Sequence, residues 1–189
     1  DSRNKRLMDG IKVSAQTVDN ILKDLSKILN IKENISKQFE YISFDKTLEL
    51  VLDSLHKDML DVDYEMNVDF SGLAGMKAFR PYMVSIFQNM LSNSFKYREP
   101  SRKLQISIRA YENNGKILLQ FSDNGRGIDL KKYGNTIFKL YSRFHKDIPG
   151  SGIGLNMVQE QARAMGGSTQ IDSAEGIGTT FTFTFVGKE

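Results

Sequence analysis

The order of helical and strand segments in this sequence predicts a mixed α/β (α+β) fold. The first third of the chain has only helical periodicity, residues 41–122 alternate helical segments with short strands, and the last strands are joined by a glycine-containing turn. Strands joined by short turns pair antiparallel. We therefore expect helices together with a sheet whose carboxyl-terminal half is antiparallel.

Length and composition indicate a globular protein with one main domain and a small appendage. The chain has 189 residues, of which 40% are apolar and 26% charged, so it can bury a sizeable core and is not expected to be disordered. The absence of cysteine excludes disulfides, thiolate metal sites and a cysteine nucleophile. Two histidines, His56 and His145, are too few for a multi-histidine metal site.

Charge and hydropathy make nucleic acid and membranes unexpected partners of this segment. Basic and acidic residues are interspersed, and the net charge is 26 − 23 = +3, which is typical of a mixed solvated surface. No apolar run approaches the roughly 20 residues that a spanning helix needs. The first ten residues contain no signal-peptide core. We expect this segment to be cytoplasmic.

A heptad seam predicts a long helix over residues 8–29. Apolar residues recur at spacings of three and four, at Met8, Ile11, Ala15, Val18, Leu22, Leu25 and Leu29. Such a strict seam is narrower than the apolar stripe of most globular helices. It therefore favours burial in a helix bundle over the alternative, packing on the chain's own domain.

Capped helices and short strands are expected over residues 34–122, after a connector at 34–43. The expected elements are an edge strand near Tyr41–Ser43, a helix from Asp45 to about Leu60, a strand over Tyr64–Val68, a loop marked by Gly72 and Gly75, a helix from about Pro81 that stops before Pro100, and strands over Leu104–Tyr111 and Lys116–Ser122. Asp45 can cap the first helix, and Pro81 suits a first helical position. Asn113-Asn114-Gly115 is typical of a hairpin turn.

The remainder of the chain begins with a long segment, from Asp123 to Gly154, that is rich in glycine and charge. A helix is expected from about Ile153 to Met165, because Gly166-Gly167 is a typical helix end. The last strands are expected over Ser168–Ser173 and Thr179–Val186.

The expected helix over residues 85–97 carries a polar stripe on an otherwise apolar surface. At 100° per residue, Asn89, Asn93 and Lys96 lie within about 60° of one another. Two amide oxygens four residues apart suit a hard cation such as Mg²⁺, and a lysine one turn further can meet a phosphate. The alternative is a solvated stripe on an amphipathic helix.

A second chemical feature is the carboxylate of Asp123, which ends a buried-looking strand directly before Gly125 and Gly127. A carboxylate there can accept a hydrogen bond from an exocyclic amine such as that of adenine, and glycines let a planar ring approach closely. The alternative is a turn in which Asp123 bonds its own backbone.

A third feature is the run of glycines at 150, 152 and 154, which opens a helix. Backbone N–H groups at a helix start bind anions, and glycines let phosphate approach. No strand directly precedes the run and no Gly-Lys-Ser/Thr ends it, so it is neither a Rossmann fingerprint nor a Walker A motif. The alternative is a flexible loop before a helix.

Together, in this order and spacing, the three segments resemble the ATP-binding domain of the Bergerat or GHKL superfamily, which sensor histidine kinases share with gyrase, large heat-shock chaperones and MutL-type repair proteins. The resemblance covers about residues 44–187. The matching motifs are the N box at Asn89, Asn93, Lys96 and Tyr97, the first glycine box at Asp123, Gly125 and Gly127, the histidine kinase F box at Ile137–Phe144, the second glycine box at Gly150, Gly152 and Gly154, and the last box at Gly176, Gly178, Thr179 and Thr180. The resemblance implies a two-layer sandwich with one mixed, largely antiparallel sheet covered by helices on one face and preceded by a long helix.

The resemblance also implies roles for the matched residues. Asn89 and Asn93 would hold Mg²⁺, and Lys96 would reach the terminal phosphates of ATP, which makes Asn89 and Lys96 the catalytic candidates. Tyr97 would lie against the adenine, and Asp123 would accept a hydrogen bond from its amino group. The other residues expected to bind ATP are Gly125, Gly127, Ile128, Gly150, Ser151, Gly152, Ile153, Gly154, Leu155, Thr179 and Thr180.

The stretch from about Arg126 to Ile148 would be a mobile lid over the nucleotide. Arg143, His145 and Lys146 in this stretch could approach phosphate, or could be ordinary surface charges. Phe138 and Phe144 are expected to be packing residues that steady the lid, and His56 is expected at the surface of its helix.

One position in the N box favours phosphoryl transfer over hydrolysis. In the gyrase and chaperone branches of the superfamily, a glutamate four residues before the second asparagine polarises the attacking water. Asn89 occupies that position here, and an amide is no general base. The phosphoryl group would then pass to another nucleophile by positioning and charge neutralisation.

The heptad helix resembles the second helix of a histidine kinase dimerisation domain, whose first helix carries the phosphoacceptor histidine. No histidine precedes His56, so the acceptor is expected outside this chain, which would then be a fragment of a larger kinase that could be membrane-anchored. The expected domains are a partial dimerisation domain at 1–33, a linker at 34–43 and a catalytic ATP-binding domain at 44–189.

The expected function is an ATP-dependent protein-histidine kinase of a bacterial two-component phosphorelay. It would form a homodimer through the helical region, and the full protein would have a response regulator receiver domain as its partner. Two alternatives remain open at this point. One is a GHKL serine kinase of the anti-sigma type, and the other is a nonenzymatic module in which bound ATP only biases a partner interface.

Overall fold

The computed structural model describes residues 38–145, 147–148 and 151–186. The chain divides after residue 33 into two units. The described residues all belong to the second unit, residues 34–189. The helix expected over 8–29 lies outside the described residues, as do Lys146 and Gly150.

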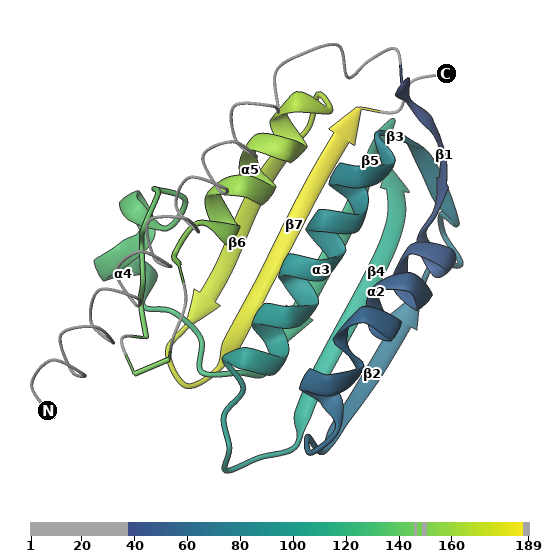
Figure 1. The fold of residues 1–189 in the computed structure, drawn as a ribbon. Helices are drawn as coiled ribbons and strands as arrows, with labels where there is room; N and C mark the ends of the chain where they lie inside the picture. The colour runs from purple at the N-terminus through teal and green to yellow at the C-terminus, as the bar shows by residue number, and fades with distance from the viewer. Residues whose placement is uncertain (1–37, 146, 149–150, 187–189) are drawn as a thin grey trace, which may run out of the picture. The chain divides into compact units, whose positions relative to one another are not determined.

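Five strands form one mixed sheet in the order β2-β4-β5-β7-β6 (Figure 1). They are β2 (Tyr64–Asp69), β4 (Leu104–Asn113), β5 (Lys116–Asp123), β6 (Ser168–Ala174) and β7 (Gly178–Val186). Strand β2 pairs with β4 in parallel, and the other neighbours pair antiparallel. The expectation of a mixed, largely antiparallel sheet is confirmed.

A two-residue turn joins β4 to β5 and fixes their register. Asn114 and Gly115 both have positive φ, 52° and 70°, and Asn113 pairs directly with Lys116. Two central residues with positive φ match the right-handed twist of the flanking strands, and asparagine followed by glycine tolerates that conformation best. The turn expected from the sequence is confirmed, and both strands extend to it.

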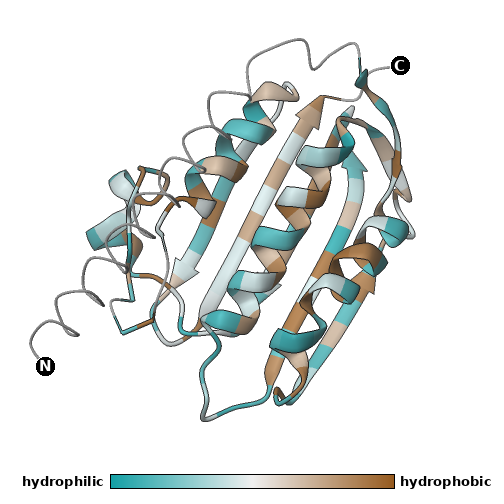
Figure 2. Ribbon diagram, in the orientation of Figure 1, coloured by the Kyte–Doolittle hydropathy of each residue, from teal (hydrophilic) through white to brown (hydrophobic). Residues whose placement is uncertain are grey.

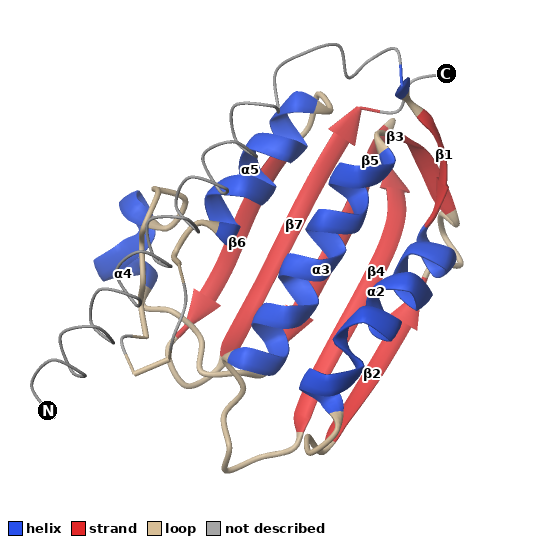
Figure 3. Ribbon diagram, in the orientation of Figure 1, coloured by secondary structure: helices blue, strands red, loops and turns tan. Residues whose placement is uncertain are grey.

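Three helices, α2 (Phe44–Met59), α3 (Arg80–Lys96) and α5 (Gly154–Ala164), cover one face of the sheet (Figures 1 and 3). Helix α3 has its proline in the first turn, and α5 ends where Gly166 adopts a φ of 79°, both as expected. None of the helices that the structure describes is long and apolar enough to cross a bilayer.

The cap of α2 differs from the expectation that Asp45 provides it. The helix begins one residue earlier, because the Ser43 hydroxyl accepts a hydrogen bond from the backbone N–H of Lys46 at 3.4 Å. Asp45 lies inside the first turn instead, where a carboxylate still interacts favourably with the helix dipole.

A second, two-stranded sheet joins the edge strand expected near Tyr41–Ser43, which is confirmed, to a strand formed where a loop was expected. Strand β1 (Glu40–Ser43) pairs antiparallel with β3 (Gly75–Ala78). A Cβ at position 75 would collide with the carbonyl oxygen of Ile42, so glycine is what lets the strands approach. The four residues of β3 are too short and too poor in β-branched residues to predict a strand by themselves.

Part of the segment between β5 and α5 is regular. A short helix, α4 (Leu130–Tyr133), is capped by Asp129, whose side chain accepts hydrogen bonds from the N–H groups of Lys131 and Lys132. A 3₁₀ turn (Gly134–Thr136) follows it. The sequence predicted neither, because four residues carry no detectable periodicity.

The core between helices and sheet is built around a row of phenylalanine rings. Phe87 of α3 lies 6.2 Å from Phe44 of α2 and 5.0 Å from Phe121 of β5, and Phe121 lies 6.1 Å from Phe183 of β7. Strand residues alternate between this apolar face and a polar face, as the hydropathy colours in Figure 2 show. The polar face carries Thr180, Thr182 and Thr184 of β7 in line.

We expect Phe87→Ala to lower the free energy of unfolding by about 3–5 kcal/mol, because Phe87 is fully buried and joins two layers of the core. Urea denaturation followed by circular dichroism measures this change. Leu50→Ala, on the exposed face of α2, is the control and should change stability by less than about 0.5 kcal/mol. Equal effects of the two substitutions would contradict this description of the core.

Candidate functional site

A cavity of about 230 Å³ collects polar groups from segments that are far apart in the sequence. Its walls come from α3, the end of β5, the start of β7 and residues 127–128, 142–145, 151–152 and 154–155. The predicted site residues that line it are Asn89, Asn93, Lys96, Tyr97, Asp123, Gly127, Ile128, Ser151, Gly152, Gly154, Leu155 and Thr179. The three chemical segments of the sequence therefore meet in one place.

Three residues predicted for the site do not line this cavity. Gly125 is buried in the turn behind it, where a Cβ would lie 2.7 Å from the carbonyl oxygen of Tyr97. Ile153 is a core residue that precedes the first turn of α5. Thr180 faces the opposite side of the sheet and shares a 2.9 Å hydrogen bond with Ser122.

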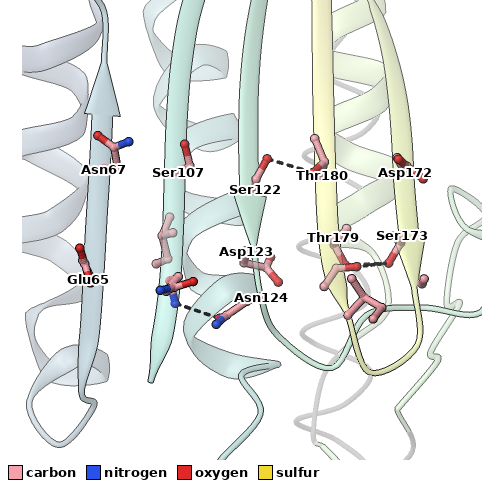
Figure 4. Close-up of a pocket in the computed structure, with 15 residues that line it drawn as sticks. Glu65, Asn67, Ser107, Ser122, Asp123, Asn124, Asp172, Ser173, Thr179 and Thr180 are labelled. Atoms are coloured by element: carbon pink, nitrogen blue, oxygen red, sulfur yellow. Dashed lines mark hydrogen bonds between the residues drawn. The ribbon is translucent and has the colours of Figure 1, made fainter. Parts of the chain in front are cut away.

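Thr180 lines a shallow hollow of about 500 Å³ on the polar face of the sheet, which shares Asp123 and Thr179 with the cavity (Figure 4). Side chains of Ser107, Ser122, Asp172 and Thr180 lie on this face. Consecutive residues of a strand point to opposite faces, so Thr179 and Thr180 cannot both reach the cavity with their side chains.

The asparagine stripe of α3 presents oxygen atoms to the cavity wall. The side-chain nitrogen of Asn89 donates to the backbone carbonyl of Ser85 at 2.8 Å, which turns its Oδ1 outward. A Cβ at Gly154 would lie 2.5 Å from that oxygen, so Asn89 and the start of α5 are close neighbours. Asn93, one turn further, also lines the cavity, and its backbone carbonyl accepts from the N–H of Tyr97 at 2.8 Å. Amide oxygens placed in this way fit a hard cation.

Lys96 and Tyr97 end α3 beside the cavity. The ammonium of Lys96 lies 5.1 Å from the centre of the Tyr97 ring, a cation–π distance. The ring of His145 lies 5.5 Å from the Tyr97 ring, and a His145 ring nitrogen is 2.9 Å from the carbonyl oxygen of Gly127. His145 therefore lies at the Tyr97 end of the cavity.

Asp123, the last residue of β5, is held by neighbours on both oxygens. Its Oδ1 accepts from the N–H of Gly125 at 2.9 Å, and its Oδ2 lies 3.2 Å from the Ser94 hydroxyl, which shares its one proton between this oxygen and the Met90 carbonyl, also at 3.2 Å. Asp123 pairs with Thr179 in the β5–β7 register, so both lie at the same end of the cavity. The alternative considered from the sequence, a bond to the local backbone, is present, and it coexists with exposure to the cavity.

The start of α5 supplies backbone groups. Gly152 has a φ of 73°, and a Cβ there would lie 2.7 Å from the backbone of Tyr141, so glycine is required by both conformation and space. The residue before the helix, Ile153, has no polar side chain to cap it. The first N–H groups of α5 are therefore available to an anion.

The family comparison decides what kind of protein carries this site. The model of the family described as histidine kinase-, DNA gyrase B- and HSP90-like ATPase matches residues 80–188, more than half of the chain. This chain belongs to that ATPase family. The recognition of a GHKL catalytic domain from its sequence motifs is confirmed.

The relatives of this chain include sensor histidine kinases. It is 24% identical to sensor histidine kinase WalK of Bacillus subtilis (strain 168) over 94% of its own length, and 33% identical to sensor histidine kinase GraS of Staphylococcus haemolyticus (strain JCSC1435) over 66%. It spans 30% and 34% of the lengths of these two relatives.

A solved structure, that of the mycobacterial sensor histidine kinase MprB, has the same fold. Its TM-score is 0.66 at 21% identity, and the match covers 79% of this chain and 99% of that one. The sandwich expected from the resemblance is confirmed by the described part of the chain and by this likeness.

Several residues beside this cavity were not predicted. Arg102, in the loop before β4, donates from one guanidinium nitrogen to the carbonyls of Gly125 at 2.8 Å and Gly176 at 2.9 Å. Ser94 holds Asp123, and Ser173 holds Thr179. None of them stands in a motif that marks it, and a lone arginine in a polar loop has the sequence signature of an ordinary surface residue.

One of the two phenylalanines expected to steady a lid packs on a neighbouring ring: the Phe144 ring lies 5.1 Å from that of Tyr133. For Phe138 the structure gives a backbone contact, because its carbonyl accepts from the Asn156 side chain at 2.8 Å. Arg143 lines the cavity and also donates to the Ile148 carbonyl at 2.7 Å. His56 is exposed on α2, as expected.

Burial of the carboxylate is the main electrostatic feature of the site. Burial raises the pKa of Asp123 above its ordinary range, although the N–H of Gly125, the Ser94 hydroxyl and the charge of Arg102 all favour the ionised form. The folded chain therefore binds a proton at Asp123 more tightly than the unfolded chain does.

This pKa shift predicts that Asp123→Asn stabilises the ligand-free protein at pH 7. Stability is lost as the pH rises from the ordinary pKa of an aspartic acid to the raised pKa of Asp123, and the loss is complete above that window. Replacing the carboxylate by an amide removes the loss, so the difference between variant and wild type should shrink as the pH falls through the window. Urea denaturation at several pH values measures it.

Asp172→Asn, on the polar face of β6, is the matched control and should give a smaller change, because the charge it removes is exposed to water. A destabilised Asp123→Asn variant at pH 7 would show that the hydrogen bonds of the carboxylate outweigh its burial.

Proposed function

We propose that residues 44–189 bind Mg²⁺-ATP and transfer its γ-phosphoryl group to a histidine on a dimerisation helix, as the kinase domain of a two-component sensor histidine kinase. The observation that carries this proposal is the convergence in one cavity of a carboxylate, two asparagines, a lysine and a helix start. Family membership supports ATP as the ligand.

The adenine would lie at the Asp123 end of the cavity. The Asp123 carboxylate would accept a hydrogen bond from the exocyclic amine, the Tyr97 ring would lie against the base, and Thr179 would be close to the same edge. Gly127 and Ile128 would line the wall beside the base. Thr180, Ile153 and Gly125 would not contact the nucleotide, because these three residues do not line the cavity.

The phosphates would lie between α3 and the start of α5. Backbone N–H groups near Gly152 and Gly154, with Ser151 and Leu155 beside them, would bind phosphate oxygens, and Lys96 would add a positive charge. Asn89 and Asn93 would hold Mg²⁺, and the free Oδ1 of Asn89 beside Gly154 fits this role. Mg²⁺ would supply charge neutralisation at the phosphates.

Transfer to a protein group is favoured over hydrolysis by the residue at position 89. Its amide is fixed by the Ser85 carbonyl and has no basic atom to take a proton from water. In this domain the described residues would therefore position ATP and neutralise its charge, and the acceptor would come from elsewhere.

The acceptor and partners of the kinase belong to the same proposal. The acceptor histidine would lie on another helix of a dimerisation domain, residues 8–29 would contribute a helix to that homodimer, and a response regulator receiver domain would take the phosphoryl group onward. The relatives, which are sensor histidine kinases, support partners of these general kinds.

We expect Asp123→Asn to weaken ATP binding at least tenfold, roughly 1.4 kcal/mol, in a calorimetric titration with Mg²⁺ present. The amide exchanges a charged acceptor for a neutral one and can point a donor at the adenine amine. Asp172→Asn, on the opposite face of the same sheet, should bind ATP as the wild type does. An unchanged affinity of Asp123→Asn for ATP would show that Asp123 does not bind the nucleotide.

Incubation with γ-labelled ATP tests the reaction itself. We expect little label on this chain, slow hydrolysis, and acid-labile label on a separately supplied dimerisation domain that carries its histidine. Lys96→Ala should reduce that label by roughly tenfold or more, because a hydrogen bond to a charged group contributes about 1.5–3 kcal/mol. Asn93→Asp should also reduce it, because the carboxylate adds a negative charge beside the phosphates. His56→Ala, a substitution of an exposed residue on α2, should leave it unchanged.

The other outcomes of this experiment identify the alternatives. Acid-labile label on this chain alone, mapped to His56 or His145, would contradict an external acceptor. Label on serine of a substrate would indicate the anti-sigma type of kinase. Binding of ATP with no label on any acceptor would indicate a nonenzymatic nucleotide-binding module.

A further inference from the structure

One hydroxyl, that of Ser173 near the end of β6, joins three parts of the nucleotide site. It accepts a hydrogen bond from the backbone N–H of Ile128 at 2.8 Å and donates to the backbone carbonyl of Gly178 at 2.8 Å. It also lies 2.9 Å from the Thr179 hydroxyl (Figure 4). Ser173 itself does not line the cavity, but Ile128 and Thr179 do.

The direction of the bond between the two hydroxyls follows from counting hydrogens. A serine hydroxyl has a single proton, and a carbonyl oxygen can only accept. Since the Ser173 proton goes to the carbonyl of Gly178, the bond at 2.9 Å must be made by the proton of Thr179. The reverse arrangement would place two oxygens 2.8 Å apart, at Ser173 and Gly178, with no proton between them.

The consequence is that Thr179 faces the cavity as an acceptor. Its one proton is used by Ser173, so only lone pairs remain for a ligand. Its register partner Asp123, when ionised, is also an acceptor only. Both polar side chains at this end of the cavity therefore suit a ligand edge that donates, such as an exocyclic amine, and oppose one that carries an oxygen.

We propose that Ser173 is a positioning residue that sets the preference of the site for a 6-amino purine over a 6-oxo purine, by orienting the hydroxyl of Thr179. This inference rests on the proposed ATP-binding function. Ser173 also ties Ile128 to the β6–β7 turn, so its loss could weaken binding by loosening the wall. A loosened wall would weaken binding of both purines alike, whereas a reoriented hydroxyl changes their ratio.

The test compares the affinities of ATP and ITP, which differ in carrying a 6-amino or a 6-oxo group, on the same preparations by calorimetry. We expect wild type to prefer ATP, and Ser173→Ala to reduce the ATP-to-ITP affinity ratio by roughly fivefold to tenfold, because Thr179 can then turn its proton toward the 6-oxo group. Ser173→Thr keeps a hydroxyl and should retain most of the wild-type ratio.

Thr179→Val removes the oriented hydroxyl itself and keeps the shape of the side chain, so it should lower the ATP-to-ITP affinity ratio by a similar factor. The double variant Thr179→Val, Ser173→Ala should have the same ratio as Thr179→Val alone. If Ser173→Ala does not fold, the ratio of Thr179→Val decides. An unchanged ratio in Ser173→Ala, or in Thr179→Val, would overturn the inference while ATP binding by the wild type still stands. Failure of the wild type to bind ATP would instead reject the proposed function.

Discussion

The site depends on a close crossing of two backbone segments at one end of the sheet. A side chain at Gly127 would collide with the carbonyl oxygen of Ala174, and one at Gly178 would collide with that of Asp123. The crossing is joined by a 2.7 Å hydrogen bond from the N–H of Gly176 to the carbonyl of Arg126. Since β5 ends and β7 begins there, the crossing places a carboxylate and a threonine hydroxyl at the same end of the cavity. Only residues without a Cβ permit it.

This close packing has an electrostatic cost, because it withdraws the carboxylate of Asp123 from water. The surrounding donors offset that cost only in part: the Gly125 N–H and the Ser94 hydroxyl bond the two oxygens, and Arg102 is held nearby by the carbonyls of the same crossing. A charged acceptor that is incompletely satisfied in the free domain can bind an exocyclic amine strongly. Conflict between stability and recognition of this kind is expected at binding sites.

Helix α3 serves the core and the site at once, because the two sets of residues lie on different faces of one helix. Phe87 contacts the rings of α2 and β5, whereas Asn89 and Asn93 face the cavity. Burial of the apolar face fixes the rotation of the helix, and the rotation fixes the direction of the asparagines. Packing of the apolar face of α3, which is remote from the cavity, would thus position the asparagines that are proposed to hold the metal.

Local sequence patterns predicted the order of the three long helices that cover the sheet and of the five strands of that sheet, the hairpin at Asn114-Gly115, and the three polar or glycine-rich segments that form the cavity. They could do so because periodicity, turn chemistry and glycine spacing are properties of neighbouring residues. Long-range contacts alone reveal that β3 pairs with β1, that Thr179 faces the cavity whereas Thr180 faces away, and that Arg102 and Ser173 belong to the site. Arg102 reaches carbonyls 23 and 74 residues away in the chain. Contacts of that range depend on how distant strands and turns meet, and they leave no periodic or local pattern in the sequence from which they could be predicted.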